Sequence, residues 1–150
     1  MATENIRTSA GTTIGISAAQ PATYNQTGFA ALTYAEISEV ENLGEFGAQY
    51  NLVTFNPLAN RTTVKRKGSK NNGSLQMTLA RDPEDAGQGI LKTASDSDVS
   101  PSFVVTTQDG TKFYFTAQVM GYTSNVGGVD NIYMASATLE IDNEIIEVAV

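Results

Sequence analysis

Alternating apolar and polar positions are the clearest pattern in this chain, and they predict a protein built mainly of β-strands. In residues 74–80, Leu75, Met77 and Leu79 occupy one face, while the residues between them are small and uncharged. Such a strand packs one face on a core and leaves the other accessible. Further strands are expected at residues 11–18, 103–108, 111–119, 132–142 and 145–150, and residues 19–33 are expected to be a loop.

The dipeptide Asp109-Gly110 is the strongest hairpin signal in the sequence. A two-residue turn there would place Val104 on the same face as Phe113. Neither face of this hairpin is fully polar, so we expect both faces to be partly covered.

One short helix is predicted over residues 83–94. Asp82 is a good N-cap, and Pro83 suits the first helical position. Gly87 and Gly89 each weaken a helix by roughly 1 kcal/mol, so packing against the rest of the protein must hold it.

Two other segments have ambiguous patterns. In residues 36–46, apolar positions recur every three residues, and Thr33 with Glu36 could form a capping box, which favours a helix. Gly44 would soon end such a helix, and a bulge near Asn42 would make the same spacing fit a strand. Residues 50–60 could be a hairpin that covers the core or an exposed arm that packs on a neighbouring subunit. The large apolar residues of that segment are Leu52, Val53, Phe55 and Leu58.

At 150 residues the chain is expected to be a single domain with a sizeable core. Sixteen acids against nine bases give a net charge of −7. Five of the bases lie within ten residues: Arg61, Lys65, Arg66, Lys67 and Lys70. This cluster could pair with acids of an adjacent subunit, protect a strand edge or bind nucleic acid. The acidic remainder favours the subunit interface over nucleic acid.

The composition argues against an enzyme. Histidine and cysteine are absent, so the usual general base, the commonest metal ligand and thiolate chemistry are missing. We find no phosphate-binding glycine motif and no EF-hand, and the acids near the predicted helix are typical of a helix start. We therefore predict no catalytic, cofactor-binding or metal-binding residues. No apolar stretch has the length of a membrane span.

The order of these segments resembles a known family. RTTVKRKGSKNNGSLQMTLARDPEDAGQGILKTA (residues 61–94) reads as a basic strand, a Gly/Asn turn, an apolar strand and a short helix. EISEVENLGEFGAQYNLVTF precedes it, and FVVTTQDGTKFYFTAQVMGYTSN and IYMASATLEIDNEI follow. This series is similar to the tail tube protein (major tail protein) of long-tailed, non-contractile bacteriophages. The resemblance covers residues 36–147 and is weaker over the first 35 residues.

The resemblance implies a two-sheet β-sandwich of about eight strands with one helix, and a strand at residues 36–46. It implies that residues 51–60 form an arm between rings. Six copies would form a ring with a shared inner β-barrel, and rings would stack into a tube. The tube would house the tape-measure protein and pass viral DNA without binding it specifically.

Further partners implied by the resemblance are the tail terminator and the distal tail proteins, with the subunit made in the host bacterial cytoplasm and located in the virion tail. The arm residues and the basic cluster would then lie at subunit interfaces. Acids facing the lumen would repel DNA, and Glu39, Glu41 and Asp109 are the candidates. Two alternatives remain: an inner-tube component of a contractile or type VI-like apparatus, and a monomeric β-sandwich that binds a ligand or decorates a capsid.

Overall fold

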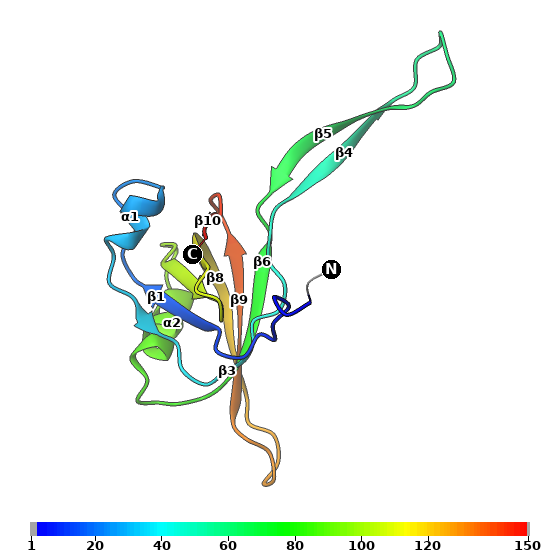
Figure 1. Cartoon of the computed structure of the whole chain (residues 1–150). Helices are drawn as coiled ribbons and strands as arrows, with labels where there is room; N and C mark the ends of the chain where they lie inside the picture. Colours follow the sequence, from blue (N-terminus) through cyan, green and yellow to red (C-terminus); the bar gives the residue numbers. More distant parts are fainter. Residues whose placement is uncertain (1–2, 150) are drawn as a thin grey trace.

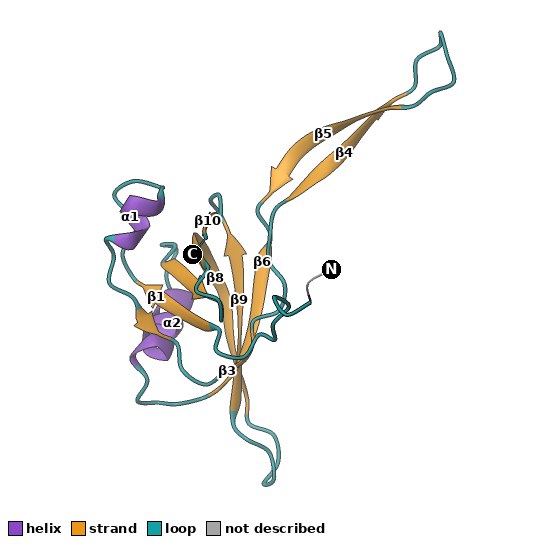
Figure 2. Cartoon of the chain, viewed as in Figure 1, coloured by secondary structure: helices purple, strands orange, loops and turns teal. Residues whose placement is uncertain are grey.

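The computed structural model describes residues 3–149, in which β-strands predominate and two helices are short (Figures 1 and 2). A curled sheet forms the body, and a two-stranded hairpin projects from it (Figure 1). We call this hairpin, residues 49–71, the arm. The mainly β fold confirms the prediction from the alternating pattern.

Eight strands form the sheet of the body. They are β1 (Thr13–Ser17), β2 (Ala35–Glu36), β3 (Val40–Asn42), β6 (Ser74–Ala80), β7 (Ser102–Thr106), β8 (Lys112–Asn125), β9 (Met134–Ile141) and β10 (Ile146–Val148). They pair in the order β2-β1-β7-β8-β9-β6-β3, with β10 also on β8, and all pairings are antiparallel. The strands thus follow one continuous path rather than the two separate sheets of the expected sandwich. The reason is β8, whose 14 residues run through both halves of the curl.

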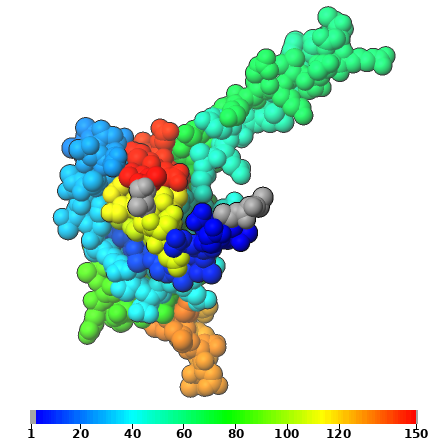
Figure 3. All heavy atoms as spheres, viewed as in Figure 1, coloured from blue at the N-terminus to red at the C-terminus, as the bar shows by residue number. Residues whose placement is uncertain are grey.

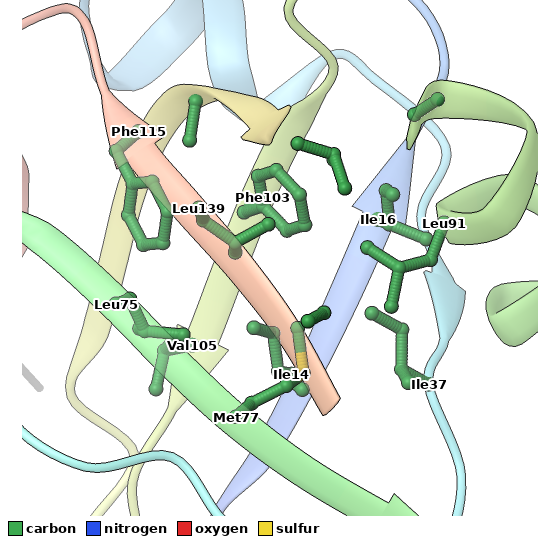
Figure 4. Close-up of a cluster of buried hydrophobic side chains, with 14 of the residues drawn as sticks. Ile14, Ile16, Ile37, Leu75, Met77, Leu91, Phe103, Val105, Phe115 and Leu139 are labelled. Carbon is green, nitrogen blue, oxygen red and sulfur yellow. The ribbon is translucent and has the colours of Figure 1, made fainter. Parts of the chain in front are cut away.

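The core lies inside the curl. Across β6 and β9, Leu75 pairs with Leu139 and Met77 with Ala137, as the alternation in β6 requires. Figure 4 shows the cluster that these strands form with β1, β7, β8 and the longer helix. Its labelled residues are each at most 2% exposed: Ile14, Ile16, Ile37, Leu75, Met77, Leu91, Phe103, Val105, Phe115 and Leu139.

Helix α2 (Ala86–Ser95) packs Leu91 onto this core, but it begins later than predicted. Asp85, not Asp82, is the N-cap, and its carboxylate accepts a hydrogen bond from the Gln88 N–H at 3.0 Å. The same carboxylate accepts from the Ser38 N–H at 3.1 Å. A contact 47 residues away in sequence therefore selects the cap.

The expectation of a single helix is wrong, because residues 19–33 contain a second one. Helix α1 (Gln26–Ala30) is capped by the Asn25 side chain, which accepts from the Gly28 N–H at 2.8 Å. Its Phe29 is fully buried and stacks on Tyr114 with ring centroids 5.7 Å apart. This helix covers the second face of the β7–β8 hairpin, which confirms that both faces are partly covered.

The turn between β7 and β8 is one residue longer than predicted. The Thr107 N–H donates to the Thr111 carbonyl at 2.9 Å, and Gly110 has a φ of +93°. This geometry is a three-residue loop whose last residue is a left-handed glycine. Phe113 therefore pairs with Val105 and shares its face with Val105 rather than with Val104, so the predicted face assignment is wrong by one residue.

Residues 36–46 contain no helix, but they form only part of the strand implied by the resemblance: Glu36 ends β2, Val40–Asn42 is β3, and residues 43–46 belong to no strand. The register shifts between Val40 and Asn42, as predicted. The Ile37 N–H donates to the Ile14 carbonyl at 2.8 Å, which ties this segment to β1. Glu39 has a φ of +60°, a left-handed conformation that costs a non-glycine residue roughly 1–2 kcal/mol. Its carbonyl accepts from the Ala80 N–H at 2.9 Å, so the kink links β3 to the end of β6.

Candidate functional site

The arm is the most exposed part of the described chain. It consists of β4 (Gln49–Phe55) and β5 (Val64–Asn71), which within residues 3–149 pair only with each other. In the space-filling view it stands clear of the body (Figure 3). A lone two-stranded hairpin is at best marginally stable in water, so its exposed apolar residues call for a packing partner. Of these residues, Leu52 is 66%, Val53 51% and Phe55 64% exposed.

The strand register gives the arm two different faces. Leu52 pairs with Lys67 and Thr54 with Lys65, so these residues share a basic face. On that face the ammonium groups of Lys67 and Lys70 lie 4.7 and 5.8 Å from the centre of the Tyr50 ring. The opposite, apolar face carries the pairs Val53–Arg66 and Phe55–Val64. A register shift between Tyr50 and Leu52 brings both lysines over the same tyrosine.

Charge is divided sharply between the arm and the body. Residues 49–71 contain five of the nine bases and no acid, so the arm carries +5 and the remainder of the chain −12. Among residues 3–149, the one ion pair within 4.0 Å joins Lys70 to Glu144 at 3.5 Å, at the base of the arm. The arm is therefore a cationic, partly apolar projection on an anionic body.

A groove in the body has the opposite character. It has a volume of about 860 Å³ and lies between residues 9–14, the segment 36–46 and the β7–β8 hairpin. Glu36, Glu39 and Glu41 line it, and no lysine or arginine does. Partly buried apolar side chains complete its wall: Val40, Leu43, Phe46 and Phe113. We call it the acidic groove.

The outward face of β6, β9 and β8 is a third surface, which we call the polar face. Strand pairing places the following residues on it: Ser74, Gln76, Thr78, Ala80, Gln118, Thr123, Asn125, Met134, Ser136, Thr138 and Glu140. Hydroxyl and amide groups dominate, Glu140 is its one acid, and it has no base. The same strands direct their apolar residues to the core, so the alternation that forms the core also produces this polar face.

At its two ends the body carries different features. The arm leaves the body at one end, and the connection between β8 and β9, residues 126–133, projects at the other (Figure 1). That connection exposes Val126, Val129 and Ile132. Both ends thus present apolar surface beyond what the body can bury by itself.

A family model described as "Phage tail tube protein, TTP" matches residues 3–149. The chain belongs to the phage tail tube protein family. It is therefore a structural subunit of a tail tube, which agrees with the resemblance seen in the sequence.

Several solved structures share the fold of this tail tube protein. The tail tube of SPP1 aligns with a TM-score of 0.69 and 14% identity, over 93% of this chain and 77% of that one. The sheath/tube terminator of the PVC extracellular contractile injection system gives 0.72 and 11%, over 99% and 100%. The tail of an empty gene transfer agent (GTA) particle gives 0.65 and 10%, over 91% and 95%. No curated protein matches the sequence.

The structure gathers the expected interface residues of this tail tube protein into one element. The apolar and basic residues all lie on the arm or its tip, where Leu58 is fully exposed. The arm is longer than residues 51–60, because the basic strand forms its second half. Its interface role remains a prediction.

The three acids expected to face the lumen are not together. Glu39 and Glu41 line the acidic groove, whereas Asp109 lies in the β7–β8 turn. Hydrogen bonds from the Thr107 hydroxyl and then from Thr111 hold the pKa of the Asp109 carboxyl below its usual range. Their lumen role remains a prediction. We did not predict Glu140 as an exposed acid of the sheet, although the alternation of residues 132–142 already placed it away from the core.

Other kinds of site find little support in the described chain. Within residues 3–149 no three histidine, cysteine, aspartate or glutamate side chains are grouped to hold a metal ion. Of the helices between residues 3 and 149, neither is long and apolar enough to cross a membrane. The arm, the acidic groove and the polar face are the candidate functional surfaces.

Proposed function

We propose that six copies of this tail tube protein form a ring, that rings stack into a hollow tube, and that the polar face lines the bore. The tube would house the tape-measure protein and conduct viral DNA into the host. The observation that carries the proposal is the arm, a projection with apolar and cationic faces that its own body does not cover.

The free edges of the sheet support ring formation. Strand β7 pairs with β8 only as far as Thr116. Beyond that residue, past the 98–101 loop, one edge of β8 has no strand partner within the described residues, namely the edge that faces away from β9. Strand β3 is the free edge at the other end of the same half-sheet. Two different free edges on one subunit allow head-to-tail pairing between copies, and such pairing closes into a ring when the rotation permits. Closure would also remove edges that otherwise invite aggregation.

Six-fold symmetry is supported by the neighbours in fold. The GTA tail structure is described with C6 symmetry, and the anti-feeding prophage baseplate, with a TM-score of 0.70 and 7% identity over 93% of both chains, is described as six-fold symmetrised. A ring of six would present six copies of the polar face to the axis.

The chemistry of the polar face suits passage of DNA. Lysine and arginine bind phosphates by releasing counterions, and this face has neither. Six Glu140 carboxylates per ring would repel phosphates at short range, within a Debye length of about 8 Å at physiological salt. We assign the bore to this face rather than to Glu39 and Glu41, because those two acids lie in the acidic groove.

By family resemblance, the tape-measure protein, the tail terminator and the distal tail proteins would contact the tube, and the subunit would be made in the host cytoplasm. The fold itself also occurs in contractile injection systems. A sheath bound to the outer surface of the tube would indicate that second role.

Removal of the arm tests the proposal. A variant in which residues 51–69 are replaced by a short Gly-Ser turn, which joins the paired residues Tyr50 and Lys70, should stay folded and remain as monomers or single rings, whereas the intact protein should form tubes. Circular dichroism checks the fold, and sedimentation with negative-stain microscopy checks assembly. Normal tubes from the shortened variant would show that the arm is not the stacking element.

A further inference from the structure

We propose that the acidic groove is the receptor for the arm of an adjacent copy. The inference rests on the proposed function, since it names the surface on which each ring engages the next. Its occupant is a second copy of this chain, with the cationic arm seated against Glu36, Glu39 and Glu41.

The arm and the acidic groove carry opposite charges. The arm has no acid and five bases, while the groove lining has three acids and no base. Lys65 and Lys67 have no acidic partner within 4.0 Å among residues 3–149. Opposite charges at an interface steer association and fix its register. The arm therefore carries unpaired cations, and the groove carries the acids that could pair with them.

The arm and the acidic groove both also carry apolar surface. Val53, Phe55 and Val64 lie together on one face of the arm. The groove offers partly buried apolar side chains beside its acids, among them Leu43 and Phe46. An arm with one basic and one apolar face needs a receptor that offers both acids and apolar surface, and a nucleic acid backbone would satisfy only the charge.

The direction of the arm supports the same pairing. It points away from the body and from its own groove, which lies around β3 and the β7–β8 hairpin (Figures 1 and 3). The chain's own arm therefore does not fill this groove, which leaves it open to the arm of another copy. The contact is then heterologous, which is the kind that propagates along a tube.

The backbone of the groove wall fits a functional role. Glu39 holds a left-handed conformation that glycine would adopt without strain. Strain of this kind concentrates at functional sites. Glu39 lines the same groove as Glu36 and Glu41.

Reciprocal charge reversal tests the pairing. K65E/K67E and E39K/E41K should each raise the critical concentration for polymerisation by at least about tenfold. An equimolar mixture of the two variants should recover part of the assembly, because the arm of each variant is opposite in charge to the groove of the other. The quadruple variant, which carries both reversals, should recover most of the assembly. Critical concentrations come from sedimentation, and negative-stain images identify the polymers.

Matched controls use exposed charges outside both surfaces. K92E/K112E and E84K/D96K make the same changes in charge and should polymerise like the unmodified protein. Thermal unfolding of every variant shows whether the subunit still folds. Because all four target residues are exposed, we expect small shifts in unfolding temperature.

The outcomes separate the two proposals. If the unmodified protein stays monomeric at every concentration, self-assembly itself is wrong, and the groove assignment falls with it. If the protein forms tubes but E39K/E41K assembles normally, or the quadruple variant shows no recovery, only the groove assignment is overturned. Binding of a short DNA duplex by the arm, lost in K65E/K67E while tubes persist, would assign the arm to nucleic acid instead.

Discussion

Truncation of one arm residue, Phe55→Ala, separates assembly from folding. The Phe55 side chain is 64% exposed in the isolated subunit, so its loss should change the free energy of unfolding by less than about 0.5 kcal/mol. Burial of a phenylalanine in an interface is worth about 1.5–3 kcal/mol. Since about 1.4 kcal/mol is a tenfold change in affinity, the critical concentration should rise by roughly 10- to 150-fold.

The assay compares the critical concentration with the unfolding midpoint of the unassembled subunit. Ile6→Ala is the control, because Ile6 is 77% exposed but lies outside the arm, the acidic groove and the free edge of β8, and it should leave both quantities unchanged. Phe115→Ala should do the reverse of Phe55→Ala: the Phe115 side chain is fully buried, and its loss should cost about 3–5 kcal/mol of stability. Unchanged polymerisation of Phe55→Ala, or a fall of more than about 2 kcal/mol in its stability, would refute the reasoning.

Three further predictions follow from the packing and the charges. A Cβ at Gly87 would lie 2.3 Å from the Glu36 carbonyl oxygen, whereas one at Gly89 would meet nothing within 4 Å. Calorimetry should therefore show that Gly87→Ala lowers the stability by about 1–3 kcal/mol and that Gly89→Ala raises it by about 0.4–1 kcal/mol. Equal effects of the two substitutions would contradict this packing. Tubes of Glu140→Lys should retain a short fluorescent DNA duplex that other tubes release on co-sedimentation, and equal release would count against the assignment of the bore. Raising the salt from 0.05 to 0.5 M should increase the critical concentration, measured by sedimentation, because the Debye length shortens to a few ångströms; a salt-independent value would exclude ionic stacking.

Elements whose signals are local could be predicted from the sequence. The alternation of Leu75, Met77 and Leu79 fixes the inward face of β6, and it needs no knowledge of other strands. Helix α1 could not be predicted this way, because five residues are too short to form a helix alone and the stacking of Phe29 on Tyr114 holds it.

Distant contacts decided the other differences. Asp82 and Asp85 are both plausible caps by residue type, and Ser38, far away in sequence, stabilises the second. The single curled sheet depends on strand order, in which β8 joins β7 to β9. Local periodicity does not indicate which distant residue contacts a helix cap, and it does not indicate the order in which strands pair.

Among the candidate surfaces, too, features with a local sequence signal could be predicted, and features that depend on distant contacts could not. Large apolar residues among Asn and Pro left a core-covering hairpin and an exposed arm equally open, and only the family resemblance favoured the arm. Its two faces were not predictable, because the register shift near Asn51 decides which lysines lie over Tyr50. The acidic groove was missed because it joins residues 9–14 to residues 36–46 and to the β7–β8 hairpin. The polar face had a sequence signal, since Ser136, Thr138 and Glu140 alternate with buried positions of β9.

Electron cryo-microscopy of the assembled, purified protein tests the central claim most directly. We predict hollow tubes of stacked six-membered rings, with β6, β9 and β8 around the bore and the arm of each subunit on a copy in the adjacent ring. Solid filaments, or a bore lined by α2 with the arm folded back on its own body, would contradict it.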